Sequence, residues 1–241
     1  NGLAQEEYCR REFPRAKARI AAAGSAVLDR LSRELTAERR EEARRLLGAT
    51  PGRPHLFYSL GGVRDFRFPQ YHRTSHASFV LQRRVAELFA RHPNVDLVIK
   101  HYGSNIETSP ISSFVRELGA SNVRVIEQPP VTRLLAGPDA FMIDFPSTTL
   151  SEMALTDKPI VFLDALARLD WLPEAREAVR RRCEFIETLD ELESRLGPAL
   201  ANGSLVPNTD RSYVENYGIC RSDGESLARA WAELERLAQG A

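Results

Sequence analysis

Three consecutive hydroxyl residues stand where a strand is predicted to give way to a helix. They are Ser147, Thr148 and Thr149. Unpaired N–H groups at a helix start lie at the positive end of the helix dipole, and together with the hydroxyl groups they favour a bound anion. Glu152 follows within about one turn and can accept hydrogen bonds from the hydroxyls of a ribose or sugar. The pattern predicts a site for a phosphate and a polyol, as in a nucleotide-linked donor.

Two basic side chains follow another apolar run, Asp96–Ile99. Lys100 and His101 stand at the end of this predicted strand. Ligands of open parallel sheets bind beyond the carboxyl ends of the strands, where such groups neutralise a pyrophosphate or a departing nucleoside phosphate. A salt-bridged lysine beside a buried, hydrogen-bonded histidine is the structural alternative.

Other strand ends carry weaker candidates. Gly61 and Gly62 allow close approach of the backbone to a phosphate or sugar, and Arg64 adds charge; a plain turn remains open. Gln128 precedes two prolines, in a loop that either contacts a base edge or only connects two elements. Asp144 either orients the hydroxyl cluster or simply ends its strand.

Other chemistries find less support. No GxSxG elbow surrounds a serine, which argues against a serine nucleophile. The i,i+4 pair His72 and His76 allows a metal reading, but the three cysteines lack a ligand pattern, so we expect no metal. We can name no catalytic base or nucleophile.

The composition is that of an ordinary globular chain. The 241 residues carry a formal net charge of zero, so no global field attracts nucleic acid, and we expect no nucleic-acid partner. No apolar run approaches the ~20 residues of a membrane span, and no secretory leader is recognisable. The odd number of widely spaced cysteines fits a reducing compartment.

Apolar runs alternate with helical patterns through most of the chain, and this alternation predicts an α/β fold, a Rossmann-like parallel sheet with helices on both faces. The predicted strands are Arg19–Ala23, His55–Leu60, Asp96–His101, Val123–Glu127, Ala140–Asp144, Pro159–Asp164 and Cys183–Ile186. The predicted helices between them are Thr74–Arg91, Pro110–Leu118, Val131–Ala136, Thr148–Thr156 and Pro173–Arg182.

The two ends of the chain depart from this pattern. Thr36–Leu47 is predicted to be a charged helix with an N-cap threonine and Gly48 as its stop. Two further helices, Asp210–Tyr217 and Asp223–Leu237, are expected after the sheet. We therefore divide the chain into an entry strand and linker helix (1–50), a Rossmann-like donor-binding domain (51–205) and C-terminal helices (206–241).

The run Asp144–Leu163, DFPSTTLSEMALTDKPIVFL, resembles the donor-site signature in the C-terminal half of two-Rossmann (GT-B) glycosyltransferases. It is most similar to bacterial capsule and CDP-glycerol glycerophosphotransferase-like enzymes, which share a strand ending in Asp, a Ser/Thr pair, a helix and a Lys-Pro like Lys158-Pro159. Ala21–Leu31 resembles the entry segment of that family, Ile99–His101 its Lys-x-His-Pro motif, and Tyr213–Leu227 its closing Asp-Gly helix.

The resemblance implies a nucleotide-activated donor as substrate, cytidine or uridine linked, with its diphosphate at Ser147–Thr149 and its hydroxyls near Glu152. It also implies a glycan acceptor bound by a separate N-terminal domain. We expect a cytoplasmic enzyme, and peripheral contact with the inner membrane is left open. The leading hypothesis is a donor-binding domain of a bacterial surface-polysaccharide glycosyltransferase, incomplete as this chain alone. Alternatives are a CDP-alditol glycerophosphotransferase-type polymerase of teichoic-acid-like polymers and a non-catalytic nucleotide-binding or interaction domain.

Overall fold

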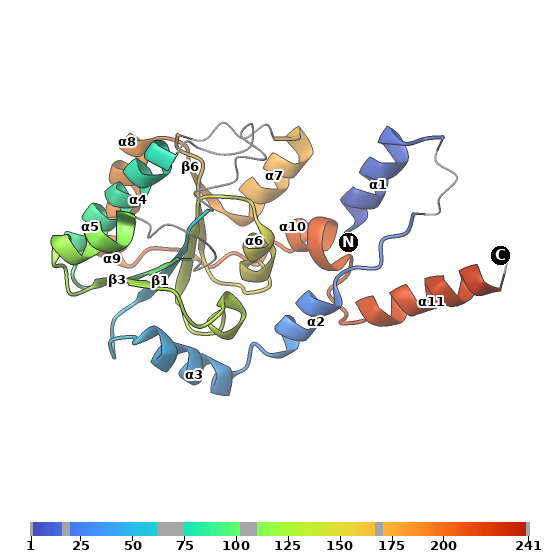
Figure 1. Cartoon of the computed structure of the whole chain (residues 1–241), viewed down its shortest axis with the longest axis horizontal. Helices are drawn as coiled ribbons and strands as arrows, with labels where there is room; N and C mark the ends of the chain where they lie inside the picture. Colours follow the sequence, from blue (N-terminus) through green and yellow to red (C-terminus); the bar gives the residue numbers. More distant parts are fainter. Residues whose placement is uncertain (1, 16–19, 62–74, 102–109, 167–170, 240–241) are drawn as a thin grey trace.

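The fold is built on one parallel sheet of six strands, in the order β3-β2-β1-β4-β5-β6 (Figure 1). The computed structural model describes residues 2–15, 20–61, 75–101, 110–166 and 171–239. The strands are β1 His55–Ser59, β2 Asp96–Lys100, β3 Val123–Ile126, β4 Ala140–Ile143, β5 Ile160–Leu163 and β6 Glu184–Ile186. Every adjacent pair of strands is parallel, as the alternation of apolar runs and helices predicts.

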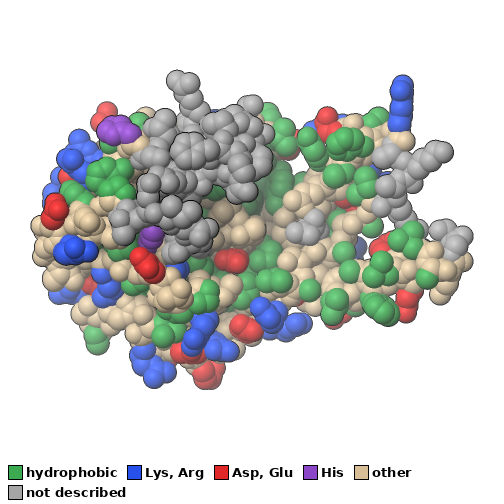
Figure 2. All heavy atoms as spheres, in the orientation of Figure 1, with side chains coloured by type: hydrophobic (Ala, Val, Ile, Leu, Met, Phe, Trp, Pro, Cys, Tyr) green, Lys and Arg blue, Asp and Glu red, His purple; other side chains and the backbone are tan. Residues whose placement is uncertain are grey.

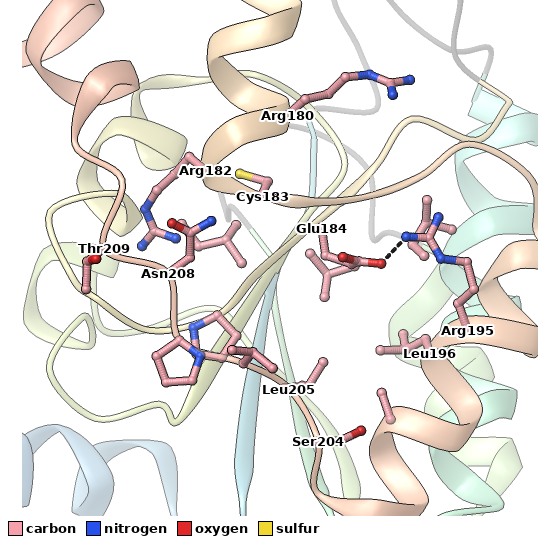
Figure 3. Close-up of a pocket in the computed structure, with 17 residues that line it drawn as sticks. Arg180, Arg182, Cys183, Glu184, Arg195, Leu196, Ser204, Leu205, Asn208 and Thr209 are labelled. Atoms are coloured by element: carbon pink, nitrogen blue, oxygen red, sulfur yellow. Dashed lines mark hydrogen bonds and ion pairs between the residues drawn. The ribbon is translucent and has the colours of Figure 1, made fainter.

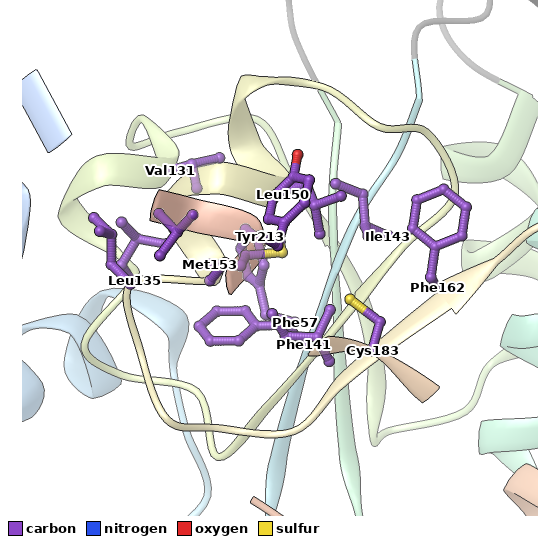
Figure 4. Packing of buried hydrophobic residues seen from close by; sticks show 14 of the residues in the cluster. Phe57, Val131, Leu135, Phe141, Ile143, Leu150, Met153, Phe162, Cys183 and Tyr213 are labelled. Carbon is purple, nitrogen blue, oxygen red and sulfur yellow. The ribbon is translucent and has the colours of Figure 1, made fainter. Parts of the chain in front are cut away.

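Helices cover both faces of the sheet because the strands are apolar on both sides. One face packs against α4 Ser75–Ala90, α5 Pro110–Leu118, the π-helix η3 Leu192–Leu196 and α9 Gly197–Asn202; the short α8 Leu189–Glu191 leads into η3. The other packs against α2 Ala26–Arg33, α3 Ala37–Leu47, the 3-10 turn η2 Val131–Arg133, α6 Thr148–Met153, α7 Pro173–Arg182, α10 Ser212–Val214 and the π-helix η4 Glu215–Ile219. Phe57, Phe141 and Phe162 of the central strands meet Met153 and Tyr213 in this second layer (Figure 4).

Salt bridges join helix α3 to the end of the sheet at which the strands begin. Its start is capped by the Thr36 hydroxyl, which accepts from Arg39 N at 3.4 Å, and its stop is Gly48 with φ +62°. Asp139, just before β4, accepts from Arg40 Nη2 at 2.9 Å and from Arg44 Nη1 at 3.0 Å. The predicted capped and charged helix is confirmed. Two of its arginines bind Asp139, which directly precedes β4.

Helices α1 Leu3–Glu12 and α11 Ser226–Ala238 lie outside the sheet layers, next to α2 and η4 (Figure 1). Arg229 ties α11 to the chain through Ala23 O at 3.1 Å. Apolar side chains of α11 remain exposed on this part of the surface (Figure 2). They are Leu227, Trp231, Leu234 and Leu237, each 52–68% exposed. Among the described helices, none combines the length and apolar content that a membrane span requires.

Four expected elements differ from the structure. The expected helix Thr148–Thr156 ends at Met153, and Asp210–Tyr217 is replaced by α10 and the π-helix η4. The predicted strand Arg19–Ala23 is absent: described residues 20–25 have no regular secondary structure, and Ala22 N donates instead to Glu6 Oε2 of α1 at 2.5 Å. An apolar run alone does not make a strand, and here the backbone of Ala22 and Ala23 bonds to side chains of α1 and α11 instead of to a neighbouring strand. The predicted helix Val131–Ala136 shortens to the 3-10 turn η2. The three-part division of the chain stays a prediction.

Candidate functional site

The sheet order places a switch point between β1 and β4. Strands β2 and β3 follow β1 toward one edge of the sheet, whereas β4, β5 and β6 follow toward the other. In open parallel sheets a crevice opens beyond the carboxyl ends of the strands at such a point. The register pairs Ser59 with Ile143, so the segments that begin at Leu60 and Asp144 leave the sheet side by side.

Asp144 ties these two segments together. Its Oδ2 accepts from the Tyr58 hydroxyl at 2.9 Å, and its Oδ1 accepts from Gly61 N. A Cβ on Gly61 would lie 2.8 Å from Phe145 Cβ and 2.9 Å from Asp144 Oδ1, so the close approach requires glycine here. Asp144 is buried, and its carboxylate holds the backbone after β1 against the end of β4.

The three hydroxyl residues at the start of α6 have three different environments. Ser147 is the N-cap, and its Oγ accepts from Thr149 N at 3.3 Å. Thr149 is buried at 6% exposure, whereas Thr148 is exposed. The helix start is therefore confirmed, and Thr148 is the hydroxyl side chain of the three that faces outward.

Glu152 lies four residues after Thr148, so both occupy one face of α6. Its side chain is half-buried, and within the described residues its carboxylate has no hydrogen-bond or ion-pair partner. Burial raises the pKa of Glu152 to about 6. A desolvated carboxylate beside the switch point is suited to accepting hydrogen bonds from ligand hydroxyls.

Lys100 and His101 occupy the end of β2, where the sequence places them. Lys100 is buried, its Nζ donates to His101 O at 3.2 Å and to Glu127 O, and desolvation lowers its pKa. This ammonium therefore joins the ends of β2 and β3 through backbone carbonyls. His101 is half-buried with Nδ1 4.0 Å from Glu127 Oε1. Direct contact of either group with a phosphate stays a prediction.

The remaining candidates are dispersed. Gln128 is exposed in the loop after β3, two strands away from β1. Gly62, Arg64 and His72 lie outside the described residues, and His76 is exposed on α4. In the described part of the chain, no group of three His, Cys, Asp or Glu side chains is arranged to hold a metal ion.

Sequence reasoning missed Tyr58 and the role of Lys158. A tyrosine inside a buried apolar strand signals a hydroxyl that needs a partner, and here that partner is Asp144. Lys158 donates to Leu135 O at 3.3 Å and Ala136 O at 2.6 Å, with Nζ 5.7 Å from the Phe141 ring centroid. The Lys-Pro element of the sequence thus anchors the start of β5 to the segment after η2.

Comparisons with known proteins rest on the fold. No family model matches the sequence, and no curated protein matches it. Among solved structures, WaaG, a glycosyltransferase involved in lipopolysaccharide biosynthesis, matches with a TM-score of 0.52 at 19% identity over 86% of this chain. A variant of the wall teichoic acid polymerase TagF matches with a TM-score of 0.59 at 14% identity over 99% of this chain. A glycosyltransferase from Rickettsia africae matches with a TM-score of 0.53 at 10% identity over the whole chain.

The chain spans 53%, 57% and 63% of the length of these three structures, in that order. At such identities the likeness concerns the fold. The shared feature is the α/β Rossmann-like fold, a parallel sheet with helices around it. The chain therefore has the Rossmann-like fold of the GT-B glycosyltransferases over about half the length of such an enzyme.

Proposed function

We propose that this chain is the donor-binding half of a glycosyltransferase that uses a nucleotide-activated donor, bound at the switch point between β1 and β4, to build a bacterial surface polysaccharide. One observation carries the proposal: Glu152, a half-buried carboxylate without a partner in the described residues, lies on the same face of α6 as the exposed Thr148. Both follow the strand end that Asp144 joins to the Gly61 backbone. A sugar hydroxyl fits the carboxylate, and a phosphate fits the helix start.

Bond cleavage in such a donor builds negative charge on the departing nucleoside phosphate. Hydrogen-bond donors that already point at that phosphate lower the barrier because they need no reorganisation as the bond breaks. The helix start at Thr148 supplies such a donor, and His101, at the end of β2, adds an imidazole nitrogen that can donate a hydrogen bond. Lys100 adds its positive charge, while its Nζ donates hydrogen bonds to the backbone carbonyl oxygens of His101 and Glu127.

A second Rossmann-like domain would supply the acceptor site. The matched part makes up only 53% and 57% of the WaaG and TagF structures, and the remainder of each supports a second domain. The exposed apolar stripe of α11, Leu227 to Leu237, offers a surface for it outside the sheet layers (Figure 2). In this arrangement the donor lies between the two halves.

Calorimetric titration with CMP, CDP, UDP and GDP tests the donor site. We expect saturable binding of at least one of these nucleotides by the chain. Because the ribose hydroxyls would lose their acceptor, Thr148→Ala plus Glu152→Ala should weaken that binding by about 10-fold or more. Glu177→Ala, at an exposed position on α7, is the matched control and should bind as the parent does.

The absence of binding by every nucleotide at millimolar concentration would exclude the donor site. Unchanged binding in the double variant would remove Thr148 and Glu152 from it. Retained binding with no transfer by any longer form of the protein that carries a second domain would favour a non-catalytic binding domain.

Transfer of an alditol phosphate is the second candidate. The match to a wall teichoic acid polymerase over almost the whole chain supports it. A preference for CDP over UDP and GDP, combined with turnover of a CDP-alditol and not of nucleotide sugars, would favour this candidate.

A further inference from the structure

A cavity of about 540 Å³ lies beside β5 and β6, away from the switch point (Figure 3). Its walls come from the beginnings of these strands, the end of α7, helices η3 and α9, and the segment 204–209. Asp144 and the start of α6 lie at the carboxyl end of β4, whereas Pro159 and Glu184 of the cavity wall precede or begin their strands. The volume is sufficient for a small organic molecule.

Arg182 is the unusual group in this wall. Its side chain is 1% exposed, and its Nη2 donates to Thr156 O at 2.5 Å and Lys158 O at 3.0 Å. Its Nε and Nη1 have no hydrogen-bond partner among the described residues, and no carboxylate there lies within ion-pair distance. A buried donor without a partner is costly, and a guanidinium stays charged even when buried.

The other charges of the wall are already compensated. Arg180 Nη2 pairs with Glu187 Oε1 at 2.7 Å. Arg195 pairs with Glu184 and donates from Nη1 to Phe185 O at 2.9 Å. The charged lining residues are three arginines and one glutamate, a formal balance of +2, and Arg182 contributes the charge that lacks a counterion.

We propose that this cavity binds a small organic anion, whose phosphate or carboxylate group accepts from Arg182. The apolar part of the wall suits the body of such a molecule. It is formed by Pro159, Ile160, Leu196, Leu205 and Val206. Arg182 Nε and Nη1 are closed to solvent in this structure, so the guanidinium must shift slightly toward the cavity to donate to the anion. An oxyanion would then satisfy a free donor and the buried charge together, and charge-assisted hydrogen bonds of this kind are among the stronger ones. The assignment does not rest on the donor site.

Thermal unfolding of the chain in increasing inorganic pyrophosphate tests this assignment, with citrate in a parallel series to separate a phosphate from a carboxylate preference. Ionic strength is held constant with NaCl. We expect the melting temperature to rise with the anion concentration and, above the dissociation constant, to climb with the logarithm of that concentration, since a ligand that binds only the folded state stabilises it. Arg182→Gln should weaken the apparent affinity about 10- to 100-fold, the loss expected for hydrogen bonds to a charged group.

Two further variants make the result decisive. Ala199→Phe puts a larger side chain into the part of the cavity wall that α9 contributes and keeps Arg182, and it should abolish the anion-dependent rise even if Arg182→Gln lowers stability by itself. Arg181→Gln removes the neighbouring exposed arginine, which does not line the cavity, and should leave the affinity within about twofold of the parent. No rise in melting temperature with either probe up to ~10 mM at constant ionic strength, or equal affinity in Ala199→Phe, overturns the assignment. Nucleotide binding in Ala199→Phe should stay unchanged, so the two sites fail separately.

Discussion

At the scale of a single residue, the half-buried carboxylate of Glu152 carries a stability cost. Its pKa is raised by burial to about 6 from an ordinary 4.5, so the folded state holds this proton more tightly than the unfolded state. Stability is greatest below pH 4.5 as far as this group is concerned, and it falls as the pH rises through 6.

We therefore expect Glu152→Gln to be more stable than the parent at pH 7.5 by at most about 2 kcal/mol, because the amide carries no charge to desolvate. At pH 4.5 the two proteins should differ little. Urea unfolding at both pH values measures this, with Glu177→Gln as the exposed control. A variant that is less stable at pH 7.5 would mean that the folded chain contains a partner for the carboxylate.

His55 makes the opposite contribution to the dependence on pH. It is fully buried at the start of β1, with Nε2 2.9 Å from Arg124 Nη2 and Nδ1 3.4 Å from Asp96 Oδ2. Burial, and then the Arg124 charge, lower its pKa to about 4 from 6.5. The folded state thus binds this proton more weakly than the unfolded state, and stability falls as the pH drops from 6.5 to 4.

We expect this residue to account for the loss of up to about 3 kcal/mol of unfolding free energy over that interval. His55→Gln should flatten the profile between pH 6.5 and 4, whatever its effect at pH 7.5. His76→Gln, at an exposed position on α4, should keep the slope of the parent. Parallel slopes in the parent and His55→Gln would show that other groups cause the acid loss.

At the scale of elements, the contact between the ends of β1 and β4 shapes the candidate site. Asp144 accepts from both the Tyr58 hydroxyl and Gly61 N, so the backbone at Gly61 cannot move away from β4 without breaking its hydrogen bond to this buried carboxylate. A Cβ added to Gly61 would lie only 2.8 Å from Phe145 Cβ, so there is no room for a side chain at this position. The ends of β1 and β4 are therefore held together as one unit at the candidate site.

Gly61→Ala should destabilise the chain by about 1–3 kcal/mol, the usual cost of forcing a methyl group into an occupied space. It should also weaken nucleotide binding, because Asp144 and the end of β4 must shift. Gly197→Ala is the matched control: its Cβ would meet Leu88 Cδ1 at 3.7 Å, an ordinary contact. Chemical denaturation of both variants measures the difference. Equal stabilities would mean that the folded chain has room for a methyl group at Gly61.

At the scale of the whole molecule, the chain has a layered core and an apolar surface outside it. The sheet is buried between two hydrophobic clusters, whereas α1 and α11 contribute little to either. Phe13, at the end of α1, is 61% exposed, and Trp231 of α11 is exposed to the same extent. We interpret this region as a surface for a second domain rather than as part of the core.

Leu227→Glu plus Trp231→Glu should then change the unfolding free energy by no more than about 0.5 kcal/mol, because both side chains are already in water. The same variant should bind less of a hydrophobic dye and should self-associate less in sedimentation experiments. A loss of more than about 1 kcal/mol would mean that the stripe packs within this chain.

The sequence by itself determined the α/β class, six of the seven predicted strands, the bounds of Pro110–Leu118 and Pro173–Arg182, and the capped start of α6. These features depend on local patterns: apolar runs, a proline at a helix start and a hydroxyl N-cap. The seventh strand, Arg19–Ala23, was wrong because strand formation also needs a partner, which no local pattern shows.

Only the tertiary structure decided how the polar side chains are used. It gave the Lys100 ammonium to backbone carbonyls, buried Thr149, paired Asp144 with Tyr58 and Gly61, and left Glu152 and one edge of Arg182 without partners in the described chain. The physical reason is distance: these groups meet across strand ends and loops far apart in the sequence, such as Tyr58 and Asp144. A residue type shows what a side chain can bind, and the fold decides what remains near enough to be bound.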